Sequence, residues 1–129
     1  MPRVFKYSDI INPEKDVQKD YFDRHSPIII CDDTAKEGEK FLVKVRVGNE
    51  YKHPAEGDHY ISYIQLWNRE TLLAEARFLP EMLGNLPGNV EIDFFVVPKV
   101  SMNLVAMSYC TKHGLWESEP KNVKVIHNE

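Results

Sequence analysis

The feature that most constrains the fold is a two-residue alternation of apolar and charged side chains from Lys40 to Val47. Successive side chains of a β-strand point to opposite faces, so this alternation predicts a strand with one buried and one solvated face. Lys44 and Arg46 occupy the solvated face. The apolar positions are Phe41, Val43, Val45 and Val47.

Short segments of similar character recur along the chain between polar or Gly/Pro-rich loops such as Asp32–Gly38 and Glu81–Asn89. About seven short strands at this spacing predict an all-β fold, an immunoglobulin-like antiparallel β-sandwich. Leu72–Leu79 alternates less cleanly and also fits a helix, but the preceding Asn68–Glu70 turn and Pro80 favour a strand. The other segments are Ile28–Cys31, Tyr60–Trp67, Val90–Val96, Met102–Tyr109 and Val123–Ile126.

A short helix is expected before the first strand, from Asn12 to Phe22. Asn12 is a good N-cap residue, and Pro13 suits the first helical position. Pro27 disfavours helical geometry at the residue before it, so the helix should have ended by Asp23–Ser26.

The whole chain, residues 1–129, is expected to form one domain, with residues 1–22 as an N-terminal extension. The net charge of −4 argues against general binding to nucleic acid or to an anionic membrane. No apolar run is long enough to span a bilayer, and the first residues lack a signal-peptide pattern. We therefore expect a cytoplasmic protein.

Two cysteines, Cys31 and Cys110, lie far apart in the sequence. In a reducing compartment they are expected to be a free thiol and a metal ligand. A structural disulfide in an exported protein is the alternative.

Cys110 and His113 form a Cys-x-x-His pair, followed at once by Gly114. A thiolate and a neutral imidazole both suit first-row transition metals, so this pair is a candidate half of a metal site. Two ligands do not make a site, and the pair alone is also compatible with chance.

Four of the five histidines lie in predicted loops next to strands, and His127 lies in the C-terminal tail, where it should be solvated. Loops at one end of a sandwich converge, so these side chains can meet Cys110 in space. Each histidine taken singly also fits an ordinary surface residue. If all five groups meet, they exceed the four ligands of a closed structural zinc site and favour iron with one open position. The four are His25, His53, His59 and His113.

Four stretches together carry a specific resemblance. They combine Cys-x-x-His-Gly-Leu-Trp with His-Pro and a later His-Tyr-Ile, and the chain thereby resembles the superoxide reductase family in its single-iron, neelaredoxin-like form. The stretches are Phe41–Glu50, His53–Pro54, Asp58–Leu66 and Leu104–Glu117.

This resemblance implies an immunoglobulin-like sandwich and a mononuclear non-haem iron. The four histidines would bind the iron in a plane, and Cys110 would be the axial ligand. The implied activity is the one-electron reduction of superoxide to hydrogen peroxide, with rubredoxin or a similar small redox protein as electron donor. Relatives form homodimers or homotetramers. Some also carry an N-terminal domain with a four-cysteine iron site, which is not expected here because no cysteine precedes His25.

The chain departs from the family pattern just before the first histidine. Where the family usually has Glu-Lys, this chain has Asp23 and Arg24. In the family the glutamate can occupy the sixth position of the oxidised iron, and the lysine attracts superoxide and supplies a proton. Asp23 is one methylene shorter, and Arg24 keeps the charge but donates a proton poorly. Lys52, beside His53, is a second candidate for the positive group.

Two other functions are compatible with the sequence. The first is a non-catalytic immunoglobulin-like binding module in which Cys110 and His113 are a vestigial metal site. The second is a superoxide dismutase that uses the same iron.

Overall fold

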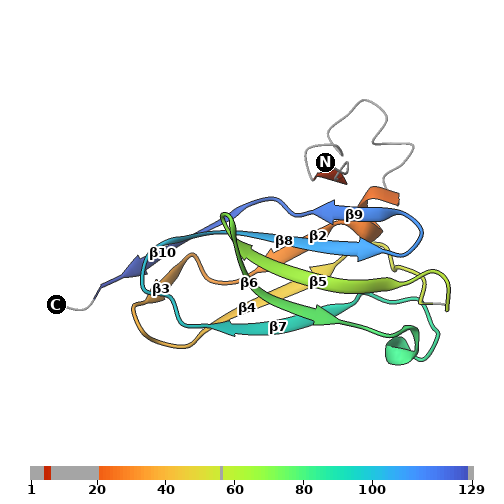
Figure 1. Cartoon of the computed structure of the whole chain (residues 1–129), viewed down its shortest axis with the longest axis horizontal. Helices are drawn as coiled ribbons and strands as arrows, with labels where there is room; N and C mark the ends of the chain where they lie inside the picture. The colour runs from red at the N-terminus through yellow and green to blue at the C-terminus, as the bar shows by residue number, and fades with distance from the viewer. Residues whose placement is uncertain (1–4, 7–20, 56, 128–129) are drawn as a thin grey trace.

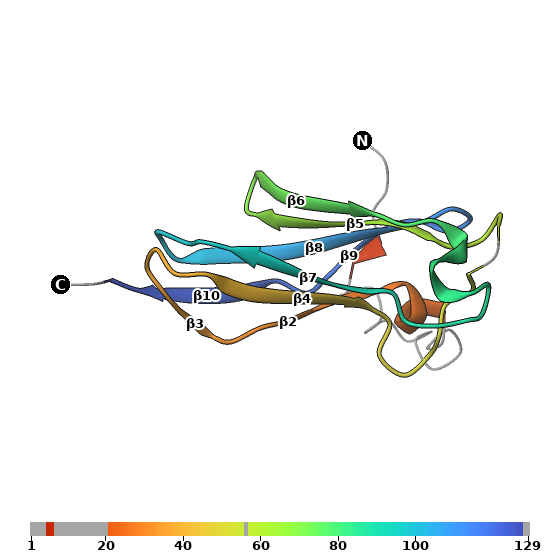
Figure 2. The ribbon, with the colours of Figure 1, turned by 90° about the horizontal axis from the view of Figure 1, so that it is seen from below.

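The computed structural model describes residues 5–6, 21–55 and 57–127. These residues form two sheets that pack face to face (Figures 1 and 2). The smaller sheet has three antiparallel strands, with β4 (Phe41–Val47) between β2 (Pro27–Ile30) and β7 (Glu91–Val96). The prediction of an all-β sandwich is confirmed.

The larger sheet is built around one long strand, β8 (Met102–Cys110). One edge of β8 pairs with β5, which in turn pairs with β6; the other edge pairs first with β10 and then, towards Cys110, with β9. The remaining strands of this sheet are β1 (Phe5–Lys6), β3 (Thr34–Lys36), β5 (Ile61–Asn68), β6 (Thr71–Arg77), β9 (Gly114–Glu117) and β10 (Lys121–Ile126).

The apolar face predicted for Phe41–Val47 lines the core between the sheets. Val43, Val45 and Val47 are completely buried. From the larger sheet, Leu66 and Leu104 are buried in the same core cluster. Burial of these aliphatic side chains is the main contribution to the stability of such a sandwich, at about 1.5–3 kcal/mol for each fully buried side chain.

The expected number of strands was too low, because the described residues form ten. Asp32–Gly38 was expected to be a loop, yet Thr34–Lys36 within it pairs in parallel with β10. Gly114–Glu117 turns back along β8 as β9, and Phe5–Lys6 pairs in parallel with β9, so the fold is not purely antiparallel. The three strands β1, β3 and β9 have only two to four residues each. Segments this short are too brief to show an alternating pattern, so the sequence alone does not predict them.

The predicted N-terminal helix lies mostly outside the described residues, which leaves positions 12–20 untested. Residues 21–25 are helical, so the helix continues past Phe22 as far as His25. It ends at Ser26, where both the backbone N–H and the hydroxyl donate to the Phe22 carbonyl. Pro27 then begins β2, as the restriction on the residue before proline requires.

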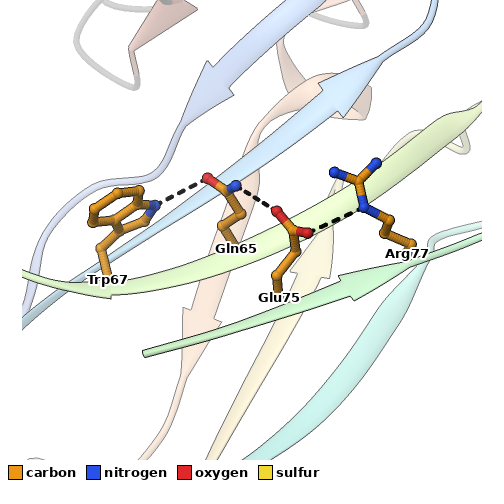
Figure 3. A network of polar contacts seen from close by, with 4 residues as sticks. All are labelled: Gln65, Trp67, Glu75 and Arg77. Carbon is orange, nitrogen blue, oxygen red and sulfur yellow. Dashed lines mark hydrogen bonds and ion pairs between the residues drawn. The ribbon is translucent and has the colours of Figure 1, made fainter. Parts of the chain in front are cut away.

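Leu72–Leu79, for which a helix was the alternative, contains most of β6, so the strand prediction is confirmed. On the outer face of β5 and β6, four side chains form a chain of polar contacts (Figure 3). Trp67 Nε1 donates to Gln65 Oε1, Gln65 Nε2 donates to Glu75 Oε1, and Arg77 Nε donates to Glu75 Oε2. The contact between Gln65 and Glu75 joins the two strands and helps to hold β6 on the sheet.

None of the helical segments within the described ranges has the length and apolar character needed to span a bilayer.

Candidate metal centre

The chain brings its candidate ligands together at one end of the sandwich, where β8 ends and β5 and β9 begin (Figure 1). The ligand atoms of four of them lie within 4.8 Å of one another, and the fifth, His113, contacts two of these. The four are His25 at the end of the helical turn, His53 opposite Gly88, His59 before β5 and Cys110 at the end of β8.

The four imidazoles form a closed ring. Going from His25 to His53, His59, His113 and back, neighbouring ring centroids are 4.7 to 4.9 Å apart, and the interplanar angles lie between 70° and 80°. Neighbouring imidazoles are therefore packed edge to face around the cluster. The Cys110 Sγ atom joins this ring at 3.3 Å from His53 Nε2 and 3.6 Å from His113 Nδ1.

Backbone carbonyl groups fix the orientation of two of the imidazoles. His25 Nδ1 donates to the Tyr21 carbonyl at 2.6 Å, and His53 Nδ1 donates to the Pro54 carbonyl at 2.7 Å. With the proton on Nδ1, the Nε2 atom of each neutral ring presents a lone pair towards the cluster. A carbonyl partner of this kind is what commonly orients a metal-binding histidine.

Burial keeps these imidazoles neutral near pH 7. It lowers the pKa of His25 to about 3 and that of His53 to about 4, against the upward effect of their backbone hydrogen bonds. Burial also lowers the pKa of His113. For Cys110, burial raises the pKa, whereas the backbone N–H groups of Lys112 and His113 act in the opposite direction.

The cluster fits a single metal ion. Two atoms on opposite sides of an ion, each bound at about 2.0–2.3 Å, are separated by about 4–4.6 Å. The 4.8 Å spread of the ligand atoms is close to that separation. Imidazole nitrogen with a sulfur ligand suits first-row transition metals, and binding would displace the Cys110 thiol proton.

The positive charge of Arg24 lies close to the cluster. Burial is the main cause of each shifted pKa there, and Arg24 additionally acts to lower the pKa of His25, His53, His113 and Cys110. Lys52 is exposed in the loop next to His53. Asp23 is the third residue that the sequence analysis singled out besides the ligands, and its carboxylate accepts hydrogen bonds from the backbone of residues 49–51.

Three residues around the cluster were not predicted from the sequence to belong to the site. The backbone carbonyl of Tyr21 accepts the hydrogen bond from His25. Every residue type has such a carbonyl, so the sequence does not reveal this contact. Trp116, part of the Gly-Leu-Trp motif, stacks on the His25 ring at 4.8 Å with an interplanar angle of 13°. Lys112, between the two residues of the Cys-x-x-His pair, acts to lower the pKa of both Cys110 and His113.

The fifth histidine, His127, lies after β10, where its Nδ1 is 3.4 Å from a Glu37 carboxylate oxygen.

The fold is a β-sandwich with a histidine–cysteine cluster that fits a metal ion, and comparison with known proteins identifies the family. A family model described as desulfoferrodoxin matches residues 15–119. A superoxide reductase from Thermococcus kodakarensis is 34% identical over 105 residues, which cover 75% of this chain and 85% of the relative. A putative superoxide reductase from Thermotoga maritima is 33% identical over 129 residues, covering 90% of this chain and 95% of the relative.

Solved structures agree with this result. A superoxide reductase (neelaredoxin) from Ignicoccus hospitalis superposes with a TM-score of 0.73 at 27% identity and covers 95% of both chains. The superoxide reductase from Nanoarchaeum equitans has a TM-score of 0.61 at 33% identity, covering 77% of this chain and 92% of the other. The chain belongs to the desulfoferrodoxin family, and the predicted resemblance to superoxide reductases is confirmed, as is the prediction of an oxidoreductase.

Proposed function

We propose that this protein is a superoxide reductase, which combines superoxide with one electron and two protons to give hydrogen peroxide. The observation that carries the proposal is the closed ring of four imidazoles with a cysteine sulfur against it. Relatives at 31–34% identity that are named superoxide reductases support the same reaction.

In this proposal one iron ion is held by Cys110 and the four imidazoles, and when bound it supplies the electron. The chain's own contribution is a pre-organised set of ligands. Carbonyl groups hold His25 and His53 with their lone pairs inward, so little reorganisation is needed on binding. Cys110 becomes a thiolate, and a thiolate ligand increases the electron density available at the metal.

Attraction of superoxide requires a local positive charge, because the chain as a whole carries a net charge of −4. Arg24 supplies such a charge next to the imidazoles. An arginine stays protonated, so it attracts the anion but is a poor proton donor. Protons would then come from solvent or from the exposed Lys52 ammonium group.

The electron for each turnover would come from a small redox protein such as a rubredoxin. A homodimer or homotetramer stays a prediction for the assembly.

The experiment is the purification of the protein from iron-containing medium, followed by metal analysis and visible spectroscopy. We expect about one iron per chain and a sulfur-to-iron charge-transfer band in the oxidised form. Superoxide should oxidise the reduced protein and yield hydrogen peroxide. Cys110→Ser should abolish the band, whereas Cys31→Ser should keep it, since Cys31 follows β2 at the end remote from His25.

The alternatives give different results. A Cys110→Ser variant that kept the band would overturn the ligand assignment. Little bound iron and no reaction with superoxide would favour a binding module, and oxygen evolved without added reductant would favour a dismutase.

A further inference from the structure

The Asp23 carboxylate is bound by three successive backbone N–H groups. Its Oδ2 atom accepts hydrogen bonds from Asn49 at 3.1 Å and from Glu50 and Tyr51 at 2.9 Å each. Successive N–H groups that converge in this way form an anion-binding concavity, and hydrogen bonds to an ionised group are stronger than neutral ones.

The same turn is held from two other directions. Arg46 donates through Nε to the Gly48 carbonyl at 3.1 Å and through Nη2 to Asn49 Oδ1 at 2.9 Å. Asn89 Nδ2 donates to the Tyr51 carbonyl at 3.0 Å. Asp23 satisfies the N–H groups of the turn, whereas Arg46 and Asn89 satisfy carbonyl oxygens, so removal of Asp23 leaves donors that these side chains do not bind.

Asp23 connects two segments that each carry an imidazole of the cluster. It lies two residues before His25 in the helical turn, and Tyr51 lies two residues before His53. His53 is fixed on its other side by reciprocal backbone hydrogen bonds with Gly88, both 3.0 Å long. The Asp23 carboxylate is therefore a direct link between the segment of His25 and the segment of His53.

We propose that Asp23 is a positioning residue that locks the Asn49–Tyr51 turn onto the helical turn and so fixes His53 relative to His25. A carboxylate that left this turn would exchange three hydrogen bonds to one charged acceptor for hydrogen bonds to water, and bonds to a charged acceptor contribute more than neutral ones. The inference rests on the proposed function in one respect, namely that the imidazole cluster binds a metal.

The test compares wild type with Asp23→Ala and Asp23→Asn. Amide hydrogen exchange of Asn49, Glu50 and Tyr51 is measured by NMR in the metal-free protein, and affinity is measured by titration with Co²⁺. In Asp23→Ala we expect exchange at these three amides to be about 10- to 100-fold faster. Co²⁺ binding should be about 10- to 100-fold weaker, as for the loss of other groups that orient metal ligands. Asp23→Asn keeps an oxygen acceptor and should be intermediate in both.

Asp93→Ala is the control, because Asp93 is an exposed carboxylate on β7 that contacts Lys44 of β4 at 3.7 Å. It should leave the exchange rates and Co²⁺ affinity unchanged. If Asp23→Ala does not fold, the same two measurements on Asp23→Asn test the proposal.

Two results would overturn the proposal. Unchanged exchange at the three amides would disprove the lock, and faster exchange with unchanged Co²⁺ affinity would disprove the positioning role. A protein that passes both tests but does not reduce superoxide would refute the proposed function and leave the role of Asp23 intact.

Discussion

At the scale of single residues, the aromatic surroundings of His25 explain how a fully buried imidazole is kept in one orientation. Trp116 stacks on one face of the ring, and the Tyr21 ring lies 4.9 Å from it. Trp116 is 1% exposed, and its Nε1 donates to the His113 carbonyl at 3.2 Å. One tryptophan therefore contacts two candidate ligands, His25 through its ring and His113 through its backbone.

Replacement of Trp116 by leucine should weaken metal binding as well as the fold. We expect a loss of about 2–4 kcal/mol in the free energy of unfolding, measured with urea. Co²⁺ affinity should fall roughly tenfold, because the His25 ring loses its stacking partner. Trp116→Phe keeps an aromatic face and should bind Co²⁺ more tightly than the leucine variant.

Trp67→Leu provides the control, because Trp67 lies on the outer face of β5 with its Nε1 bound to Gln65 (Figure 3). Its Co²⁺ affinity should equal that of wild type. Equal Co²⁺ affinity in Trp116→Leu would show that stacking on His25 does not matter for the site.

At the scale of elements, the turn after β4 depends on a glycine. Gly48 has a φ of 85°, and a Cβ atom there would lie 2.7 Å from Asn89 Nδ2 and 2.8 Å from the Tyr51 carbonyl oxygen. Its N–H also donates to the Ser26 carbonyl, next to His25. The turn can approach the His25 segment this closely only without a side chain at position 48.

Gly48→Ala should therefore destabilise the protein by roughly 2–5 kcal/mol, through both backbone strain and steric overlap. Gly38 is a matched control with a φ of 76° and no atom within 4 Å of the added Cβ. Gly38→Ala should cost only about 1–2 kcal/mol, from the backbone alone. Urea unfolding of both variants measures the difference, and equal shifts would contradict a close approach at Gly48.

The same elements show why some strands follow from local sequence and others do not. Phe41–Val47 alternates strictly because β4 lies in the middle of a sheet with one buried face, and the strand predicted from Lys40 to Val47 differs from β4 by one residue. Thr34–Lys36 buries only Ala35, and its strand exists because β10 lies alongside it. Pairing of this kind depends on residues some 90 positions away, which no local pattern reveals.

At the scale of the whole molecule, the cluster exists because the sandwich brings distant segments to one end. The five candidate ligands were chosen from residue type, from predicted loop positions and from the family resemblance. The imidazoles close into a ring because β2, β5 and β8 pack together, and this packing cannot be predicted from the spacing of the residues in the sequence. The contacts of Asp23 could not be predicted from the sequence either, because its three partners are backbone N–H groups.

Burial of neutral imidazoles in this fold has a consequence for acid stability in the metal-free protein. The pKa values of His25 and His53, about 3 and about 4, lie below the value of about 6.5 expected for an unfolded chain. Between about pH 6.5 and 4, the unfolded state therefore binds more protons than the folded state, and stability falls as the pH falls.

From pH 7 to pH 5 we expect a loss of about 2 kcal/mol for each of these imidazoles, measured as the free energy of urea unfolding of the metal-free protein. His53→Gln should reduce this pH dependence. His127→Gln should leave it unchanged, because His127 is exposed beyond β10. Metal binding displaces the Cys110 thiol proton, which is harder at lower pH, and the metal binds only the folded state tightly, so saturation with Co²⁺ should raise stability at pH 7 more than at pH 5. Equal stability of the metal-free protein at the two pH values would contradict the burial of neutral imidazoles at this end of the sandwich.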